Sequence, residues 1–241
     1  NGDEYNPLSG NDEQRFVIAL ALHHARKWIN DPENFQPLRL LVAGVAGTGK
    51  SFILNCITTL LRKIFMCNGA VHLMAPTGCA AFLIGGRTCH AVLSLPVGKK
   101  AAGQLEPPSG EVLMRLQREA ESNVAMLTDE RSMIGRRSYG WQEWHAKHAA
   151  ACGGPFDSWG CLPIKIDFGD DLQLDPVLDP PVHNRKPSEI PADNHGLIVA
   201  DSYKRAVVLT ETMRQSDPVF RDLLTNMRTY DNTEDEVRLL M

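Results

Sequence analysis

The sequence predicts an α/β domain in which a parallel sheet is covered by helices on both faces. Short apolar segments alternate along the chain with longer helical segments, and this alternation is typical of a parallel sheet. The chain has 241 residues, of which 43% are hydrophobic, so it can bury a sizeable core. We expect residues 1–10 to form a tail and residues 11–241 to form one domain.

Local patterns place the elements in order. The first helix begins after Asn11, which can form a capping box with Gln14, and Phe16, Leu20, His24 and Trp28 fall on one of its faces. Apolar runs predict strands at 38–43, 70–75, 123–128, 162–168 and 206–210. We expect a short helix within 76–86 and longer helices at 50–66, 111–121, 132–150, 217–228 and 233–240. Loops are expected at 96–110 and, because of its prolines, at 176–196.

Composition excludes several classes of protein. Lys and Arg number 25 against 29 Asp and Glu, which excludes a protein that binds DNA by bulk positive charge but not one with a local basic groove. No apolar run approaches the ~18 residues of a membrane span. The six cysteines are scattered without a CxxC pair, so we expect a reducing, intracellular compartment. The chain opens without Met, and we expect it to be part of a longer protein.

Residues 44–51 read GVAGTGKS, which is the P-loop pattern G-x-x-x-x-G-K-S between an apolar strand and a helix. Its backbone N–H groups and the helix N-terminus can surround a phosphate. We expect Lys50 to bridge the β- and γ-phosphates and Ser51 to bind Mg²⁺. The rest of the cradle is formed by Gly44, Gly47, Thr48 and Gly49. By itself the motif indicates a nucleotide binder, because kinases, GTPases, transporters and motors share it.

An acidic pair, Asp129 and Glu130, comes directly after an apolar strand. Asp129 would hold Mg²⁺ through its water shell, and Glu130 would orient and deprotonate an attacking water. We expect the pair at the tip of the strand that adjoins the P-loop strand, facing the same metal.

Two later segments carry further candidates. Asp170 and Gln173 follow the next strand and could meet the γ-phosphate or its attacking water, although an ordinary acidic turn explains them equally well. Arg214 follows the last strand, where a cation could neutralise charge in the transition state. A solvated surface arginine is the alternative for Arg214.

Five motifs occur in the order GVAGTGKS, APTGCAAFLIGGRTCHAVLSLP, DERSM, GDDLQL and a final segment that contains MRQ. Together they resemble those of the RecD-like, PIF-family DNA helicases of superfamily one, over about residues 9–241. The segment 76–90 is the most specific, since P-loop kinases and GTPases have no reason to carry it. The resemblance implies the first, RecA-like motor domain of an ATP- and Mg²⁺-dependent helicase, with a second RecA-like domain outside this chain.

The resemblance also implies roles for single residues. Gln14 would read the adenine edge, with a purely capping role as the alternative. Gln173 would couple the γ-phosphate to strand movement, and Arg214 would be the γ-phosphate arginine of this domain. The path of single-stranded DNA would be lined by Thr77, Gly78, Thr88 and His90, although His90 could instead be a structural histidine.

For the whole protein, the resemblance implies a monomeric motor that moves five-prime to three-prime and opens duplex junctions. Its compartment would be the nucleus or mitochondrion in a eukaryote and the cytoplasm otherwise, and its work would serve DNA repair, recombination or telomere maintenance.

Four residues depart from the family's pattern, which has apolar residues or proline at these positions: Arg131, Lys165, Asp167 and Asp175. Arg131, Lys165 and Asp175 motivate an alternative, a nucleotide-gated DNA-binding module that does not unwind. A P-loop kinase is the second alternative, and it predicts phosphate transfer to a small acceptor without a response to DNA.

Overall fold

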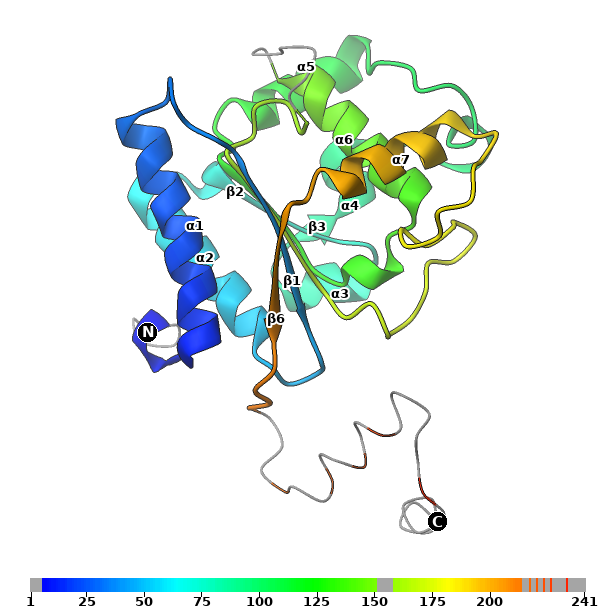
Figure 1. Cartoon of the computed structure of the whole chain (residues 1–241). Helices are drawn as coiled ribbons and strands as arrows, with labels where there is room; N and C mark the ends of the chain where they lie inside the picture. Colours follow the sequence, from blue (N-terminus) through cyan, green and yellow to red (C-terminus); the bar gives the residue numbers. More distant parts are fainter. Residues whose placement is uncertain are drawn as a thin grey trace.

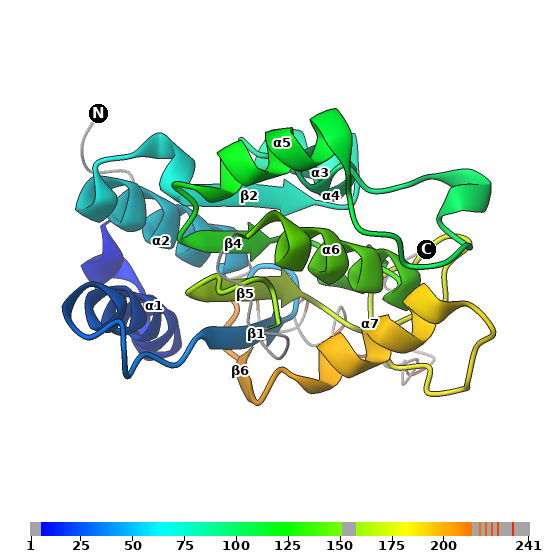
Figure 2. The same cartoon turned by 90° about the horizontal axis from the view of Figure 1, so that it is seen from above.

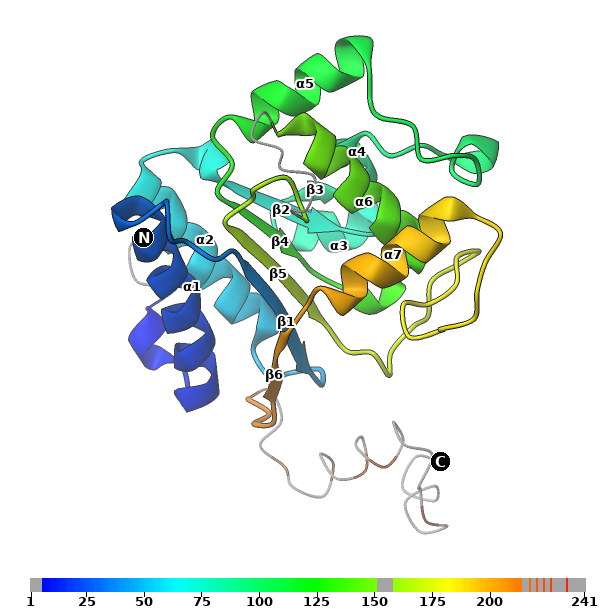
Figure 3. The same cartoon turned by 45° about the horizontal axis from the view of Figure 1, so that its top comes forward.

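The computed structural model describes residues 6–150 and 158–213, together with positions 217, 220, 223, 226 and 233. Within this part of the chain one sheet has the strand order β3-β2-β4-β5-β1-β6, with every neighbouring pair parallel. Figure 1 shows the whole chain, and the order of the strands can be followed in Figure 3. The strands are β1 (Leu38–Gly44), β2 (Val71–Ala75), β3 (Arg87–Thr88), β4 (Ala125–Thr128), β5 (Ile164–Gly169) and β6 (Arg205–Leu209). The predicted α/β class with a parallel sheet is confirmed.

Helices cover both faces of this sheet, as Figures 2 and 3 show: α1 and α2 lie on one face, and α5, α6 and α7 on the other. The α-helices are α1 (Asp12–Asn30), α2 (Lys50–Phe65), α3 (Gly78–Leu83), α4 (Cys89–Leu93), α5 (Gly110–Ala120), α6 (Arg136–Ala149) and α7 (Pro191–Asp201). Short 3₁₀ turns are η1 (Pro7–Ser9), η2 (Asn68–Ala70), η3 (Gly98–Lys100) and η4 (Arg131–Met133). In the described ranges, none of the helices combines the length and apolar character that crossing a bilayer requires.

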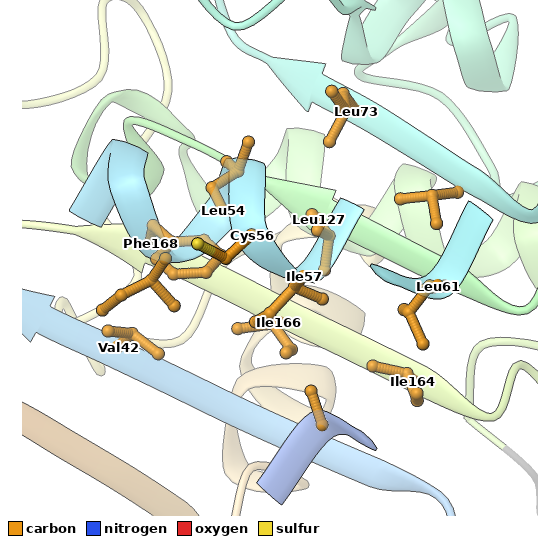
Figure 4. Close-up of a cluster of buried hydrophobic side chains, with 14 of the residues drawn as sticks. Val42, Leu54, Cys56, Ile57, Leu61, Leu73, Leu127, Ile164, Ile166 and Phe168 are labelled. Atoms are coloured by element: carbon orange, nitrogen blue, oxygen red, sulfur yellow. The ribbon is translucent and has the colours of Figure 1, made fainter. Parts of the chain in front are cut away.

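The main core lies between α1, α2 and the sheet (Figure 4). Alternate strand residues point to this face, because side chains in a strand have a period of two. The strands contribute Val42, Leu127, Ile164, Ile166 and Phe168, and α2 contributes Leu54, Cys56, Ile57 and Leu61. Each fully buried aliphatic or aromatic side chain stabilises the fold by roughly 1.5–3 kcal/mol. The opposite face packs Met74 and Met126 against aromatic residues of α6 and the segment before β5.

The strand order corrects one expectation. β5 lies between β1 and β4, so the strand that ends at Asp129 does not adjoin the P-loop strand. Chain order does not reveal this arrangement, because β5 follows β4 in the sequence but lies between β1 and β4 in the sheet. The acidic pair and the P-loop still share the carboxyl edge of the sheet, since all strands run in the same direction.

Two local predictions are also wrong in part. Of the four residues expected on one face of α1, His24 is buried and Leu20 and Trp28 pack partly buried against the core, whereas Phe16 is 57% exposed. The expected loop at 176–196 ends early, because Pro191 occupies the first turn of α7, where its fixed φ favours the helix. The expected helices at 217–228 and 233–240 fall largely outside the described residues.

Candidate functional site

The P-loop joins β1 to α2 and is closed by its own hydrogen bonds. The Lys50 ammonium donates to the carbonyl oxygens of Gly44 (2.6 Å) and Val45 (3.1 Å), and the Thr48 hydroxyl donates to Val45 O (2.9 Å). Gly49 has a φ of +85°, and a Cβ there would lie 2.2 Å from Gln14 Nε2. Only glycine fits this left-handed position, so the loop can wrap tightly ahead of α2.

Gln14 supports the same loop from α1. Its Oε1 accepts from Asn11 N (3.1 Å), while Asn11 Oδ1 accepts from Gln14 N (2.9 Å), so the predicted capping box is confirmed. The Gln14 Nε2 group also donates to Thr48 O (2.9 Å). Sequence reasoning missed this second contact, because Gln14 and Thr48 lie 34 positions apart.

The acidic pair follows β4 in a poorly hydrated environment. Burial raises the pKa of Asp129, although the hydrogen bond from Glu130 N (3.0 Å) and the Lys50 charge act in the opposite direction. Burial also raises the pKa of Glu130, with a further contribution from the charge of Asp129. Buried carboxylates of this kind are stabilised by a nearby cation, and carboxylate and hydroxyl oxygens are the ligands that Mg²⁺ prefers.

Residues of the P-loop and of the acidic pair line one cavity of about 500 Å³. Its size is typical of sites for small ligands, which measure ~300–1,000 Å³. Its wall includes P-loop residues, the acidic pair and one of the two candidates that follow β5: Gly47, Gly49, Lys50, Ser51, Asp129, Glu130 and Gln173. Cationic and hydroxyl groups on one side thus face carboxylates on the other, a donor set that fits a nucleotide phosphate with Mg²⁺.

The turn after β5 places Gln173 at the cavity and Asp170 behind it. Asp170 is only 2% exposed; its Oδ1 accepts from Leu172 N (3.3 Å), and its carbonyl oxygen accepts from Gln173 N (2.9 Å). Asp170 therefore shapes the turn that presents Gln173. Arg214, the other candidate for the γ-phosphate, lies outside the described residues.

The segment expected to face DNA begins at the same edge of the sheet. The Thr77 hydroxyl oxygen accepts from Ala80 N (3.2 Å) as the N-cap of α3, and the Thr88 hydroxyl oxygen accepts from Ala91 N (3.2 Å) as the N-cap of α4. Because each hydroxyl oxygen acts here as an acceptor, each hydroxyl group can still donate a hydrogen bond of its own. Gly78 and His90 are exposed, so all four candidate residues lie on or close to the surface.

Sequence and structure comparisons agree on one family. A family model described as PIF1-like helicase matches residues 11–232. The ATP-dependent DNA helicase PIF1 of Saccharomyces cerevisiae (strain YJM789) is 30% identical over 232 residues, which cover 95% of this chain and 24% of that protein. The protein of the same name from Emericella nidulans is 30% identical over 190 residues, covering 78% of this chain and 24% of that protein.

Solved structures show the same fold. The Pif1 helicase from Candida albicans matches with a TM-score of 0.69 and 24% identity, over 95% of this chain and 46% of that one. Pif1 from Bacteroides, in complex with ADP-AlF3 and single-stranded DNA, matches with a TM-score of 0.65 and 24% identity, over 95% of this chain and 48% of that one. These likenesses establish the predicted RecA-like fold. The chain spans about a quarter of the length of the curated relatives (24%), and it belongs to the PIF1-like helicase family.

Proposed function

We propose that this chain is the first motor domain of an ATP-dependent DNA helicase, spanning residues 11–241. The observation that supports this best is the single cavity that combines Lys50, Ser51, Asp129, Glu130 and Gln173 in a member of the PIF1-like helicase family. The relatives named above are ATP-dependent DNA helicases, and one of the matching structures contains ADP-AlF3 and single-stranded DNA.

In this proposal ATP occupies the cavity, and Lys50 exchanges its bonds to loop carbonyls for bonds to the β- and γ-phosphates. Ser51 and Asp129 hold Mg²⁺, which neutralises phosphate charge when it is bound. Glu130 orients the attacking water and accepts its proton. Gln173 contacts the γ-phosphate, and Arg214 supplies a further positive charge.

Single-stranded DNA and duplex junctions are the proposed partners. The Thr77 and Thr88 hydroxyl groups donate hydrogen bonds to DNA phosphates, and Gly78 and His90 border the path of the single strand. Movement runs five-prime to three-prime, with a second RecA-like domain completing the ATP site in a monomeric motor. The compartment is reducing, the nucleus or mitochondrion in a eukaryote, and the described cysteines are all free thiols.

The test compares Lys50→Ala with the wild type in the protein that carries this sequence. We expect single-stranded DNA to stimulate ATP hydrolysis in the wild type and Lys50→Ala to abolish it. Lys63→Ala is a matched control, because Lys63 is exposed on the same helix α2 and should leave turnover unchanged. Full DNA-stimulated turnover by Lys50→Ala would refute the proposal.

A nucleotide-gated DNA-binding module is a second candidate, favoured by the departures from the family's pattern at Arg131, Lys165 and Asp175. It predicts that nucleotide changes the affinity for single-stranded DNA without ATP turnover or unwinding. A P-loop kinase predicts turnover that needs a small acceptor and ignores DNA. Measuring ATP turnover with and without single-stranded DNA separates the three functions.

A further inference from the structure

The four residues that depart from the family's pattern lie in one region of the molecule. Lys165 and Asp167 lie on β5, which runs directly into the turn that contains Asp170 and Gln173. Arg131 begins η4, directly after Glu130. Arg131 and Asp175 line the same small cavity of about 150 Å³ as Asp171.

The inner part of this region is a completely buried ion pair. Lys165 and Asp167 are both 0% exposed and contact each other, and the Tyr139 hydroxyl donates to the Asp167 carboxylate. The Lys165 ammonium also donates to Thr128 Oγ1 (2.7 Å). Thr128 is paired with Asp167 in the sheet and immediately precedes Asp129, so these contacts join β5 to the end of β4.

The outer part is a second ion pair, which joins the two turns themselves. Arg131 Nη1 lies 2.6 Å from Asp171 Oδ1, and the side chains are 14% and 51% exposed, respectively. The backbones are also close, because a Cβ at Gly169 would lie 3.1 Å from Arg131 Cβ. The guanidinium is therefore held in a shielded position, where an ion pair is stronger than at a fully exposed site.

We propose that Arg131 is a positioning residue that holds the Gln173 turn at a fixed distance from the Glu130 turn. Glu130 precedes Arg131 by one position, and Gln173 follows Asp171 by two, so the pair ties together the two sides of the cavity. Glu130 itself has a φ of +51°, a left-handed conformation that surrounding contacts must maintain. The negative charge of Asp167 also favours the charged form of Arg131. The effect on catalysis rests on the proposed function.

The test uses Arg131→Met, Asp171→Asn and the double variant in the protein that carries this sequence. Arg185→Met with Asp201→Asn is a matched control, because that pair has the same 2.6 Å separation but is exposed at both ends, 61% and 57%. We expect each Arg131 or Asp171 variant to lower kcat for ATP about tenfold, which corresponds to about 1.4 kcal/mol in the barrier. The KM for ATP should change less than about twofold, because the groups that bind the phosphates are unchanged.

The double variant decides whether the two residues act together. Its kcat should equal that of either single variant, since the second substitution removes a contact that is already lost. Losses that multiply, or a change confined to KM, would overturn the proposal. Asp171 is half-exposed, so Asp171→Asn should fold even if Arg131→Met does not, and its kcat then still tests the ion pair.

Hydrogen exchange separates this inference from the proposed function. Arg131→Met and Asp171→Asn should both raise amide exchange in residues 129–133 and 169–173 and leave the interior of α2 unchanged. This readout needs no ATP turnover, so it tests the connection between the turns even in a protein that does not hydrolyse ATP. Unchanged exchange in both turns would refute the connection.

Discussion

Replacement of Lys165 by methionine tests the buried charge pair on β5. Methionine is unbranched and of similar length, so it fits the same space beside the Trp159 ring, whose centroid lies 4.7 Å from the ammonium. The substitution leaves the Asp167 carboxylate buried without its cation. Breaking a buried pair in this way costs about 3–5 kcal/mol, which is a large share of a total stability of about 5–15 kcal/mol.

The double variant Lys165→Met with Asp167→Leu isolates the cause of this loss. It removes both charges, and replacing a whole buried pair by apolar residues is often neutral. The Tyr139 and Thr128 hydroxyls each lose a partner, at about 1 kcal/mol apiece. We therefore expect the double variant to be about 1–2 kcal/mol less stable than the wild type and clearly more stable than Lys165→Met.

Urea unfolding at several pH values measures both effects. Burial acts to raise the pKa of Asp167, but the Lys165 ammonium and the hydrogen bonds from Lys165 and Tyr139 hold it below its usual 3.8. In the wild type, the ionised Asp167 carboxylate stabilises the folded state above pH 3.8. This stabilisation is lost as the pH falls through the pKa that Asp167 has in the folded state, which lies below 3.8. In Lys165→Met the carboxyl lacks its cation, so its pKa should rise, and the loss of stability should shrink in acid. A loss under about 1 kcal/mol at pH 7, or a double variant as unstable as the single one, would refute the reasoning.

Three further substitutions test other parts of the site. Burial raises the pKa of Asp129, so the folded state binds this proton more tightly than the unfolded state, and the folded state loses stability as the pH rises above 3.8, the usual pKa of an aspartate. Asp129→Asn should therefore raise the Tm of the nucleotide-free protein at pH 7 and remove the stabilisation of the protein by Mg-ADP. An unchanged or lower Tm would contradict this. Gln14→Ala removes half of the capping box and the bond to Thr48 O, so urea unfolding should show a loss of about 2 kcal/mol; a value within experimental error of the wild type would mean that these contacts add nothing. Asp179 accepts from two backbone N–H groups in the first turn of α6, one on each carboxylate oxygen (3.0 and 2.9 Å), and Asp179→Ala should cost about 1 kcal/mol in the same assay. Asp179→Asn has one acceptor oxygen and should recover only about half of this loss.

The parts of the fold that could be predicted are those that neighbouring residues determine. The apolar run of β1 with its glycine-rich turn located the cradle, and the Asn11–Gln14 spacing located the start of α1. The 162–168 strand was expected despite Lys165 and Asp167, and β5 is fully buried because the two charges neutralise each other. The two residues are two positions apart and point to the same face of the strand, so their spacing indicates this pairing even though each charge alone argues against a buried strand.

Contacts between distant residues could not be predicted. Arg131 and Asp171 are 40 positions apart, and the bonds from Asp179 to α6 span 41 and 42 positions. Similarly, the prolines at 176–196 indicated a loop, although Pro191 in fact begins α7, because proline both ends helices and occupies their first turn. The correct choice depends on whether the following residues can pack, and Ala192 and Val199 do so in the core beside α6.

The position of β5 also determines what the cavity can bind. Neighbouring strands lie about 4.8 Å apart, so the inserted strand separates the ends of β1 and β4 by about 10 Å. With one strand between them, there is room for a phosphate beside Lys50 and a cation beside the Asp129 carboxylate. The turn after β5, which presents Gln173, then lies between the two, where a group that responds to the terminal phosphate is most useful.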